Sequence, residues 1–225
     1  MTTITFDGAA GYLVRAKTQR AGVVLLPTIF GVNPFVRDWA STLAEHGITA
    51  LVWDIYPGED LPGDYNAAIK AAGRLRDAPA LAAMTKCVDF LAGELHVTTV
   101  GTMGFCLGGR YVFMLAAQDR RLAACAAIYP SIHAPNQPSQ DEDAVARAAA
   151  IACPVQLVYP GRDHITSNET FHRLQQNLQR RDAPTAVQYY PTAGHGFLHN
   201  DAPENQAAAR QARPLISAFL AGCLG

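Results

Sequence analysis

Residues Val97–Tyr111 read VTTVGTMGFCLGGRY, and this stretch determines the fold that we expect. An apolar run rich in β-branched residues leads into GFCLG at residues 104–108, and a helical pattern follows from Gly109 to Gln118. The pattern predicts a buried strand, a sharp turn and a helix. Glycines on both sides let the two backbones approach closely around a strained turn that presents the central side chain. That side chain is the thiol of Cys106.

Cys106 is expected to sit directly before the first turn of a helix. Unpaired N–H groups and the helix dipole favour negative charge at such a position, and the thiolate is the nucleophilic form of cysteine. The stretch therefore predicts a cysteine nucleophile on a hydrolase scaffold. A lone G-x-C-x-G motif is a weak signal, because an isolated cysteine is more often a small buried apolar side chain than a nucleophile, so other residues have to decide between these interpretations.

Short apolar runs alternate with helical patterns along the rest of the chain, and such runs are typical of strands buried in a parallel sheet. The runs lie at residues 22–26, 49–53, 123–129, 155–159 and 186–190. Two edge strands, Ile4–Phe6 and Tyr12–Ala16, are expected at the N-terminus around a glycine-bearing turn. This order predicts an α/β fold, a doubly wound, mostly parallel sheet with helices on both faces. We expect a single domain over residues 1–225.

Two stretches interrupt this alternation. Residues 54–78 are rich in proline and glycine and predict an excursion with one weak helix, after which Pro79 is expected to start a better one. Residues 130–143 are polar and proline-rich, and they predict a loop on the surface.

Two further polar side chains follow predicted strands. Asp163 comes after residues 155–159, and His195 comes after residues 186–190. In an open parallel sheet, side chains that follow strands meet outside the carboxyl edge. The order Cys106, Asp163, His195 is also the order of nucleophile, acid and histidine in α/β-hydrolases. We expect Cys106 to attack a carbonyl carbon, His195 to transfer protons and Asp163 to orient the imidazole.

Attack on a carbonyl carbon produces an oxyanion that needs hydrogen-bond donors. The backbone N–H of Leu107, directly after the nucleophile, is expected to be one donor. The loop after residues 22–26 supplies the other, and we choose the N–H of Ile29 for this role.

Composition excludes several other classes of protein. Hydrophobic residues make up 49% of the chain and charged residues 16%, and the net charge is -1, which gives no attraction to nucleic acid or anionic membrane surfaces. Five scattered cysteines without zinc-site spacing predict reduced thiols and a cytoplasmic location. Neither a leader peptide nor a membrane span is expected. Without a metal-ligand motif or a glycine-rich phosphate loop, we expect no cofactor and no metal.

Together the motifs resemble the dienelactone hydrolase family, also called carboxymethylenebutenolidases, over nearly the whole chain. The shared motifs are IFGVN at 29–33, DIYP at 54–57, GFCLGG at 104–109, GRDH at 161–164 and AGHGF at 193–197. The resemblance implies an α/β-hydrolase fold, a triad of Cys106, Asp163 and His195, and an oxyanion hole from Leu107 and Ile29. It also implies opening of an unsaturated lactone through a covalent acyl-enzyme, in a monomeric protein that acts on small esters or lactones.

Two positions depart from the well-studied members of that family. Those members carry a glutamate directly before the IFGVN segment, which helps to generate the thiolate, and an arginine at the position of His199, which binds a substrate carboxylate. This chain has Thr28 at the first position, and a hydroxyl does not accept the thiol proton at neutral pH, so activation is expected to rest on His195 and the helix N-terminus. The candidate substrate contacts are Thr28, Arg74, Arg76, Tyr129 and His199.

Three functions are compatible with these observations. The first is a cysteine hydrolase of a small ester or lactone. The second is a ligand-binding or thiol-redox sensing module with little turnover, which the two departures favour. The third is a thioesterase or amidase, because acyl transfer to these bonds uses the same groups.

Overall fold

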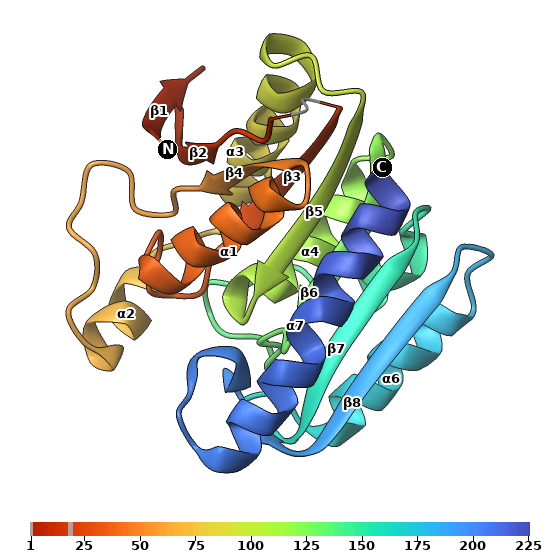
Figure 1. Ribbon diagram of the computed structural model, residues 1–225. Coiled ribbons are helices and arrows are strands. Elements are labelled where there is room, and N and C mark those ends of the chain that lie inside the picture. Colours follow the sequence, from red (N-terminus) through yellow and green to blue (C-terminus); the bar gives the residue numbers. More distant parts are fainter. Residues whose placement is uncertain (1, 18–19) are drawn as a thin grey trace.

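The computed structural model describes residues 2–17 and 20–225 of the chain (Figure 1). In them a single sheet contains eight strands, β1 (Thr2–Phe6), β2 (Ala9–Val14), β3 (Ala21–Leu26), β4 (Ile48–Trp53), β5 (Thr99–Phe105), β6 (Leu122–Ile128), β7 (Val155–Arg162) and β8 (Thr185–Gly194). Their spatial order is β1-β2-β4-β3-β5-β6-β7-β8. The β1/β2 and β2/β4 pairs are antiparallel, and all other pairs are parallel. The predicted α/β architecture is therefore confirmed.

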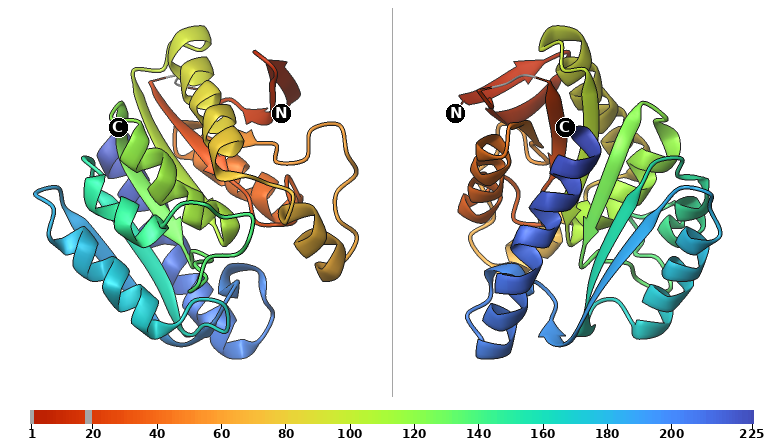
Figure 2. Two further views of the ribbon diagram at one scale, coloured as in Figure 1. Left: turned by 180° about the vertical axis from the view of Figure 1, so that it is seen from behind. Right: turned by 45° about the vertical axis from the view of Figure 1, so that its right-hand side comes forward.

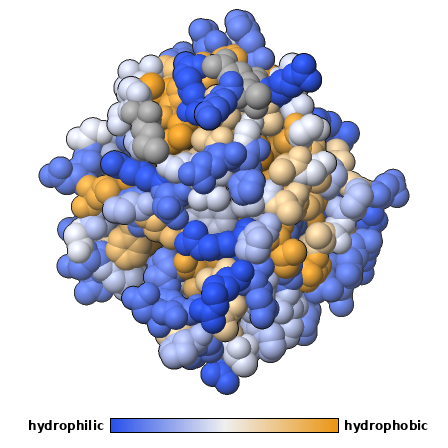
Figure 3. Space-filling view, in the orientation of Figure 1, coloured by the Kyte–Doolittle hydropathy of each residue, from blue (hydrophilic) through white to orange (hydrophobic). Residues whose placement is uncertain are grey.

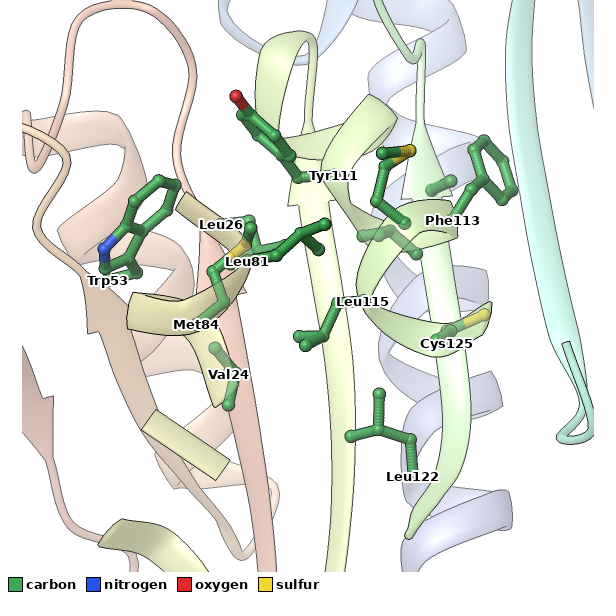
Figure 4. Close-up of a cluster of buried hydrophobic side chains, with 14 of the residues drawn as sticks. Val24, Leu26, Trp53, Leu81, Met84, Tyr111, Phe113, Leu115, Leu122 and Cys125 are labelled. Carbon is green, nitrogen blue, oxygen red and sulfur yellow. The ribbon is translucent and has the colours of Figure 1, made fainter. Parts of the chain in front are cut away.

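Helices cover both faces of this sheet. They are α1 (Pro34–Glu45), α2 (Tyr65–Ala72), α3 (Asp77–Asp89), α4 (Leu107–Gln118), α5 (Ala144–Arg147), α6 (Asn168–Gln179) and α7 (Pro203–Leu224), with short turns η1 (Phe90–Glu94), η2 (Ala148–Ala150) and η3 (Phe197–His199). α1 and α7 lie on one face, and α3, α4 and α6 lie on the other (Figure 1, Figure 2). Each face encloses a buried apolar core. Figure 4 shows the core under α3 and α4, where Met84 and Leu81 approach Val24 and Leu26 of β3.

The N-terminal hairpin is tighter than the sequence predicts. Asp7 and Gly8 alone form the turn, with φ values of 43° and 73°, and β2 begins at Ala9 instead of Tyr12. Positive φ at both central residues is the type I′ geometry, which matches the twist of the strands that it joins. Helix α3 also starts earlier than predicted, at Asp77, because proline is tolerated within the first turn and does not have to be its first residue.

The stretch at residues 130–143 agrees with its prediction only in part. Residues 134–136, 138, 141 and 143 are exposed, as predicted for a surface loop, but Ser131, Ser139 and Gln140 are only 6%, 6% and 7% exposed. Its backbone is paired inside the protein, since the Ser131 N–H donates to the Cys106 carbonyl at 2.8 Å and the Gln140 N–H donates to the Gln137 carbonyl at 2.8 Å. A polar stretch can be buried when its backbone N–H and C=O groups find partners inside the protein, so polar composition alone does not establish exposure.

A buried ion pair connects this stretch to two helices. Asp77 and Arg110 face each other with both side chains 1% exposed, and their two hydrogen bonds measure 2.7 and 2.9 Å. Arg110 also donates to the Glu142 carbonyl at 2.7 Å, and Asp77 accepts the Glu142 N–H at 2.9 Å. Burial alone would raise the pKa of Asp77, but the hydrogen bonds and the charge of Arg110 lower it below its ordinary value.

Replacing Asp77 with alanine should reduce the free energy of unfolding by about 3–5 kcal/mol, because Arg110 remains buried without its partner. Urea unfolding followed by circular dichroism measures the change. As a control, Arg74→Ala removes an exposed ion pair with Glu59 and should not move the unfolding midpoint. Because the pKa of Asp77 is lowered on folding, its contribution is present above the ordinary carboxyl range and is lost as the pH falls through the lowered value. Equal midpoints for the two variants would contradict this assignment.

In the view of Figure 3, hydrophobic residues form small separate patches among hydrophilic ones. Within residues 2–17 and 20–225, none of the helices combines the length and the hydrophobicity that crossing a bilayer would require.

Candidate active site

The turn between β5 and α4 has the geometry of a nucleophile elbow. Cys106 lies between the two elements with φ 53° and ψ -114°, which is a strained conformation for a residue with a side chain. The glycines around it permit the close approach that the sequence predicted. A Cβ atom at Gly104 would overlap the backbone of Gly108, and one at Gly108 would overlap the backbones of Leu26 and Pro27.

Neighbouring backbone holds the elbow in this conformation. The Cys106 N–H donates to the Ile128 carbonyl at 3.1 Å. The Cys106 carbonyl accepts the N–H groups of Ser131 at 2.8 Å and Arg110 at 3.1 Å. A strained residue persists only where its surroundings fix it in this way, and such strain is concentrated at functional sites. The Cys106 residue is 8% exposed, so the thiol is largely shielded from solvent.

Asp163 and His195 form a buried pair. The Asp163 carboxylate is fully buried and the His195 side chain is 8% exposed, with 2.8 Å between Oδ2 and Nδ1. The other carboxylate oxygen accepts the N–H groups of Ile165 at 2.8 Å and Thr166 at 2.9 Å. An ionised carboxylate only accepts hydrogen bonds, so Nδ1 of the ring carries a proton. Nε2 is the ring nitrogen that does not bond to Asp163.

His195 Nε2 is buried and has no hydrogen-bond partner among the described residues. Burial opposes a charged ring, but the charge of Cys106 and the hydrogen bond to Asp163 outweigh it and raise the pKa of His195 to about 10. The sulfur is thus close enough to act on the ring, although the two groups do not meet in a well-formed hydrogen bond. The structure brings Cys106, Asp163 and His195 together, as expected from their positions after three strands.

We expect His195 to keep both ring protons at neutral pH. Its raised pKa means that the favourable contacts of the imidazolium are complete below the ordinary value of 6.5 and are lost as the pH rises through about 10. Titration of the His195 ring carbon signal by NMR should give a midpoint near 10. The variant Asp163→Asn removes one source of the shift and should lower that midpoint. A wild-type midpoint at or below 6.5 would contradict the electrostatic account.

Two backbone N–H groups beside the thiol are free to bind an anion. Neither the N–H of Leu107, at the start of α4, nor that of Ile29 forms a hydrogen bond within the described residues. Both residues line the cavity next to Cys106. The loop at Ile29 is held in place by Tyr56, whose hydroxyl donates to the Ile29 carbonyl at 2.8 Å. This contact connects the IFGVN and DIYP motifs, because Ile29 belongs to the first and Tyr56 to the second.

A small cavity of about 60 Å³ opens at Cys106. One wall comes from α2 and the residues after it, a second from the elbow, and a third from the stretch at residues 130–143. The lining residues are Ile29, Tyr65, Ile69, Ala72, Leu75, Cys106, Leu107, Tyr111, Ser131, His133, Gln137, Ser139, Gln140 and Ile165. Apolar side chains therefore face uncharged polar ones across the cavity.

The two arginines expected near a substrate carboxylate do not line this cavity. Arg74 forms an exposed ion pair with Glu59, with 2.6 Å between Nη2 and Oε2. Arg76 donates to the Pro138 carbonyl at 3.3 Å. Each guanidinium group therefore contacts another part of the protein and does not belong to the cavity wall.

The remaining three candidate contacts lie behind the reactive groups instead of in the cavity. Thr28 is buried, and its hydroxyl accepts the Phe30 N–H at 3.2 Å. Tyr129 is fully buried and packs edge-on against His195, with ring centres 5.2 Å apart. His199 is exposed over part of its surface, but its ring packs on Phe35, and burial together with the charge of His195 lowers its pKa.

Sequence reasoning missed the polar lining of the cavity. Ser131, His133, Gln137, Ser139 and Gln140 all come from the stretch predicted as a surface loop. The signal that would have found them is topological, since this stretch directly follows β6, the neighbour of the elbow strand. Residues after that strand have to lie at the same carboxyl edge as Cys106.

Two features together define the α/β-hydrolase class. One is a mostly parallel sheet with a strained elbow before a helix, and the other is a buried Asp–His pair at the same edge of that sheet. The family model of the dienelactone hydrolase family matches residues 9–223. The chain belongs to the dienelactone hydrolase family and is a hydrolase of that family. In residues 2–17 and 20–225, no group of three or more His, Cys, Asp or Glu side chains is arranged to hold a metal ion.

Individual relatives agree with this assignment. The chain is 32% identical over 185 residues to carboxymethylenebutenolidase from Rhodococcus opacus, covering 78% of this chain and 69% of that protein. It is 30% identical over 219 residues to carboxymethylenebutenolidase 2 from Cupriavidus pinatubonensis, covering 95% and 90%. A provisionally named dienelactone hydrolase from Klebsiella pneumoniae has a similar structure, with a TM-score of 0.86, 24% identity and coverage of 98% and 96%. This structural similarity, at 24% identity, shows a shared fold.

Proposed function

We propose that the protein hydrolyses a small ester or lactone with Cys106 as nucleophile, through a covalent acyl-enzyme. The observation that carries this proposal is the strained Cys106 beside the buried, unpartnered Nε2 of His195, whose other nitrogen is held by Asp163. Buried polar atoms rarely lack a partner, so an unpartnered Nε2 next to a thiol supports a role in proton transfer.

The proposed reaction has two stages. In the first, the Cys106 sulfur attacks the carbonyl carbon, and the oxyanion accepts hydrogen bonds from the N–H groups of Leu107 and Ile29. The C–O bond then breaks, His195 protonates the leaving alkoxide, and a thioester remains on Cys106. In the second, His195 removes a proton from water, the hydroxide attacks the thioester, and the sulfur leaves as a thiolate. With a lactone substrate, the alcohol stays attached to the acyl group until this hydrolysis.

Activation of the thiol is proposed to need no residue at position 28. The Thr28 hydroxyl holds its own turn by accepting the Phe30 N–H, which leaves it no role as a base. The pKa of His195, raised to about 10, supports a resting imidazolium beside the Cys106 sulfur, and such a cation stabilises the negative charge of a thiolate nucleophile. The N-terminus of α4 adds its dipole to this stabilisation.

The relatives named carboxymethylenebutenolidase support an ester or lactone as the substrate, and the cavity of about 60 Å³ favours a small acyl group. The chain's cysteines are all free, including the buried Cys87, Cys125 and Cys153, and this supports action in a reducing compartment, which we propose is the cytoplasm.

Turnover with 4-nitrophenyl acetate and with an unsaturated γ-lactone tests the proposal. We expect product to exceed enzyme at least about a hundredfold, at a rate typical of enzymes. Iodoacetamide should abolish this activity with one alkyl group on Cys106. The matched control is Cys223→Ala, which removes the most exposed thiol and should stay active and equally sensitive to iodoacetamide. Activity retained after complete alkylation of Cys106 would contradict the proposal. At most one product per enzyme would favour a binding or sensing module instead.

A further inference from the structure

A glutamine whose amide oxygen is unpaired belongs to the wall of the cavity at Cys106. Gln140 is 7% exposed and lines the cavity, and its Oε1 atom is buried without a hydrogen-bond partner. Four buried side-chain atoms in residues 2–17 and 20–225 share this property, and Gln140 is the one among their residues that lines the cavity. The Gln140 backbone N–H donates to the Gln137 carbonyl, so the group that lacks a partner is in the side chain. Because an unpaired buried amide is unfavourable, its position at the reaction centre indicates a ligand that satisfies it.

The other polar side chains of the cavity wall carry no charge. Gln137 donates its Nε2 amide to His133 Nε2 at 3.0 Å, and the Ser131 hydroxyl lies 3.3 Å from the same nitrogen. An amide NH₂ group only donates, so His133 Nε2 is an acceptor and the ring is neutral. Burial and the charge of Arg110 also lower the pKa of His133. This histidine therefore supplies no positive charge for a substrate anion.

No lysine or arginine side chain lines the cavity within the described residues. Arg110, the buried cation behind it, has both terminal nitrogens bonded to Asp77 and to the Glu142 carbonyl. Arg74 and Arg76 are exposed and do not line the cavity, and they bond to Glu59 and to the Pro138 carbonyl. A carboxylate that entered the cavity would lose its water without gaining a lysine or arginine partner, which is unfavourable.

We propose that Gln140 is a specificity-determining residue that binds a hydroxyl group of the substrate through its amide, and that the enzyme prefers uncharged, hydroxylated esters or lactones over those with a carboxylate. The hydroxyl donates to Oε1, and the facing apolar side chains of Ile29, Ile69 and Leu75 take up the carbon skeleton. This inference rests on the proposed hydrolysis at Cys106. It adds the substrate class, which differs from the carboxylate-bearing lactones implied by the family resemblance.

Three 4-nitrophenyl esters of similar size test the inference: the 3-hydroxybutanoate, the 3-methylbutanoate and the monoester of succinic acid. The wild type should show a kcat/KM at least about tenfold higher for the hydroxy ester than for the methyl ester, because a site built to bind a hydroxyl rejects an analogue that lacks it. The succinate ester should be the slowest. A wild type that prefers the succinate ester would overturn the inference.

Variants locate the preference in Gln140. Gln140→Leu should bring the ratio of the two neutral esters to about one, because leucine offers no acceptor for the hydroxyl. The matched control Gln176→Leu changes an exposed glutamine of α6 and should leave the ratio unchanged. A ratio that persists in Gln140→Leu overturns the assignment. If Gln140→Leu does not fold, the order of the three esters with the wild type still decides the substrate class.

A binding measurement separates recognition from chemistry. Calorimetry of the three esters with Cys106→Ala should show the hydroxy ester binding at least about tenfold more tightly than the methyl ester, and Cys106→Ala/Gln140→Leu should lose this difference. Hydrolysis without any preference would overturn the inference and leave the proposed function standing. Preferential binding of the hydroxy ester without hydrolysis by the wild type would contradict the proposed function and leave the inference standing. Absence of both the binding difference and the kinetic difference refutes the inference.

Discussion

Cys106→Ala should lower kcat/KM for 4-nitrophenyl acetate by at least about ten thousandfold, because the variant retains the anion-binding N–H groups but has no atom to form the acyl bond. Steady-state hydrolysis followed at the absorbance of nitrophenolate measures the loss. Rapid quenching of the wild type should trap an acyl group, and peptide mass spectrometry should place it on Cys106. Alanine is compatible with the small space at the elbow, so folding should be maintained.

The control for this prediction is Cys223→Ala, because Cys223 is half-buried near the end of α7, outside the cavity at Cys106. It should retain activity within a factor of about two, as substitutions away from a site do. A Cys106→Ala variant that keeps a tenth or more of the wild-type activity would refute the nucleophile assignment. An acyl group found on another residue would also refute it.

Asp163→Asn should reduce kcat by about ten thousandfold, because an asparagine amide that donates to Nδ1 would force the imidazole into the wrong tautomer. Of the three hydrogen bonds that the carboxylate accepts, those from Ile165 and Thr166 can persist to the amide oxygen, so the loop should keep its shape. The effect should therefore fall mainly on kcat, with little change in KM. The pH profile should lose the contribution of the His195 imidazolium.

Asp38→Asn is the matched control, because Asp38 is an exposed aspartate that pairs loosely with Arg213 at 3.3 Å. Its kinetic constants should equal those of the wild type. If Asp163→Asn lost less than tenfold in kcat, the carboxylate would be a structural group of the loop and not an orienting partner of His195.

The regular elements could be predicted from sequence because they depend on local patterns. Buried parallel strands appear as continuous apolar runs, and the elbow strand and its helix were found from the GFCLG turn, with observed bounds of Thr99–Phe105 and Leu107–Gln118. The cap of helix α1 is local in the same way, because Asn33 directly precedes Pro34 and its side chain accepts the Val36 N–H at 3.1 Å. These features need no knowledge of distant contacts.

The walls of the site depend on contacts between distant parts of the chain, and sequence patterns do not reveal them. The pair Asp77–Arg110 spans 33 residues, and Thr166 receives the Ile132 N–H across 34 residues. Such bonds turn a polar stretch inward, whereas composition alone predicted exposure. Arg74 is the opposite case. The sequence predicted a contact with the substrate, but Arg74 pairs with Glu59 on the surface.

The anchors of the stretch after β6 have a consequence for redesign. One end is pinned to the elbow by the bond from Ser131 to Cys106, and the other end is pinned by the bonds of Glu142 to Asp77 and Arg110. Residues 133–141 between these anchors carry most of the polar lining. We expect substitutions of exposed residues in this segment to change selectivity, because the anchors at its two ends keep the reaction centre in place.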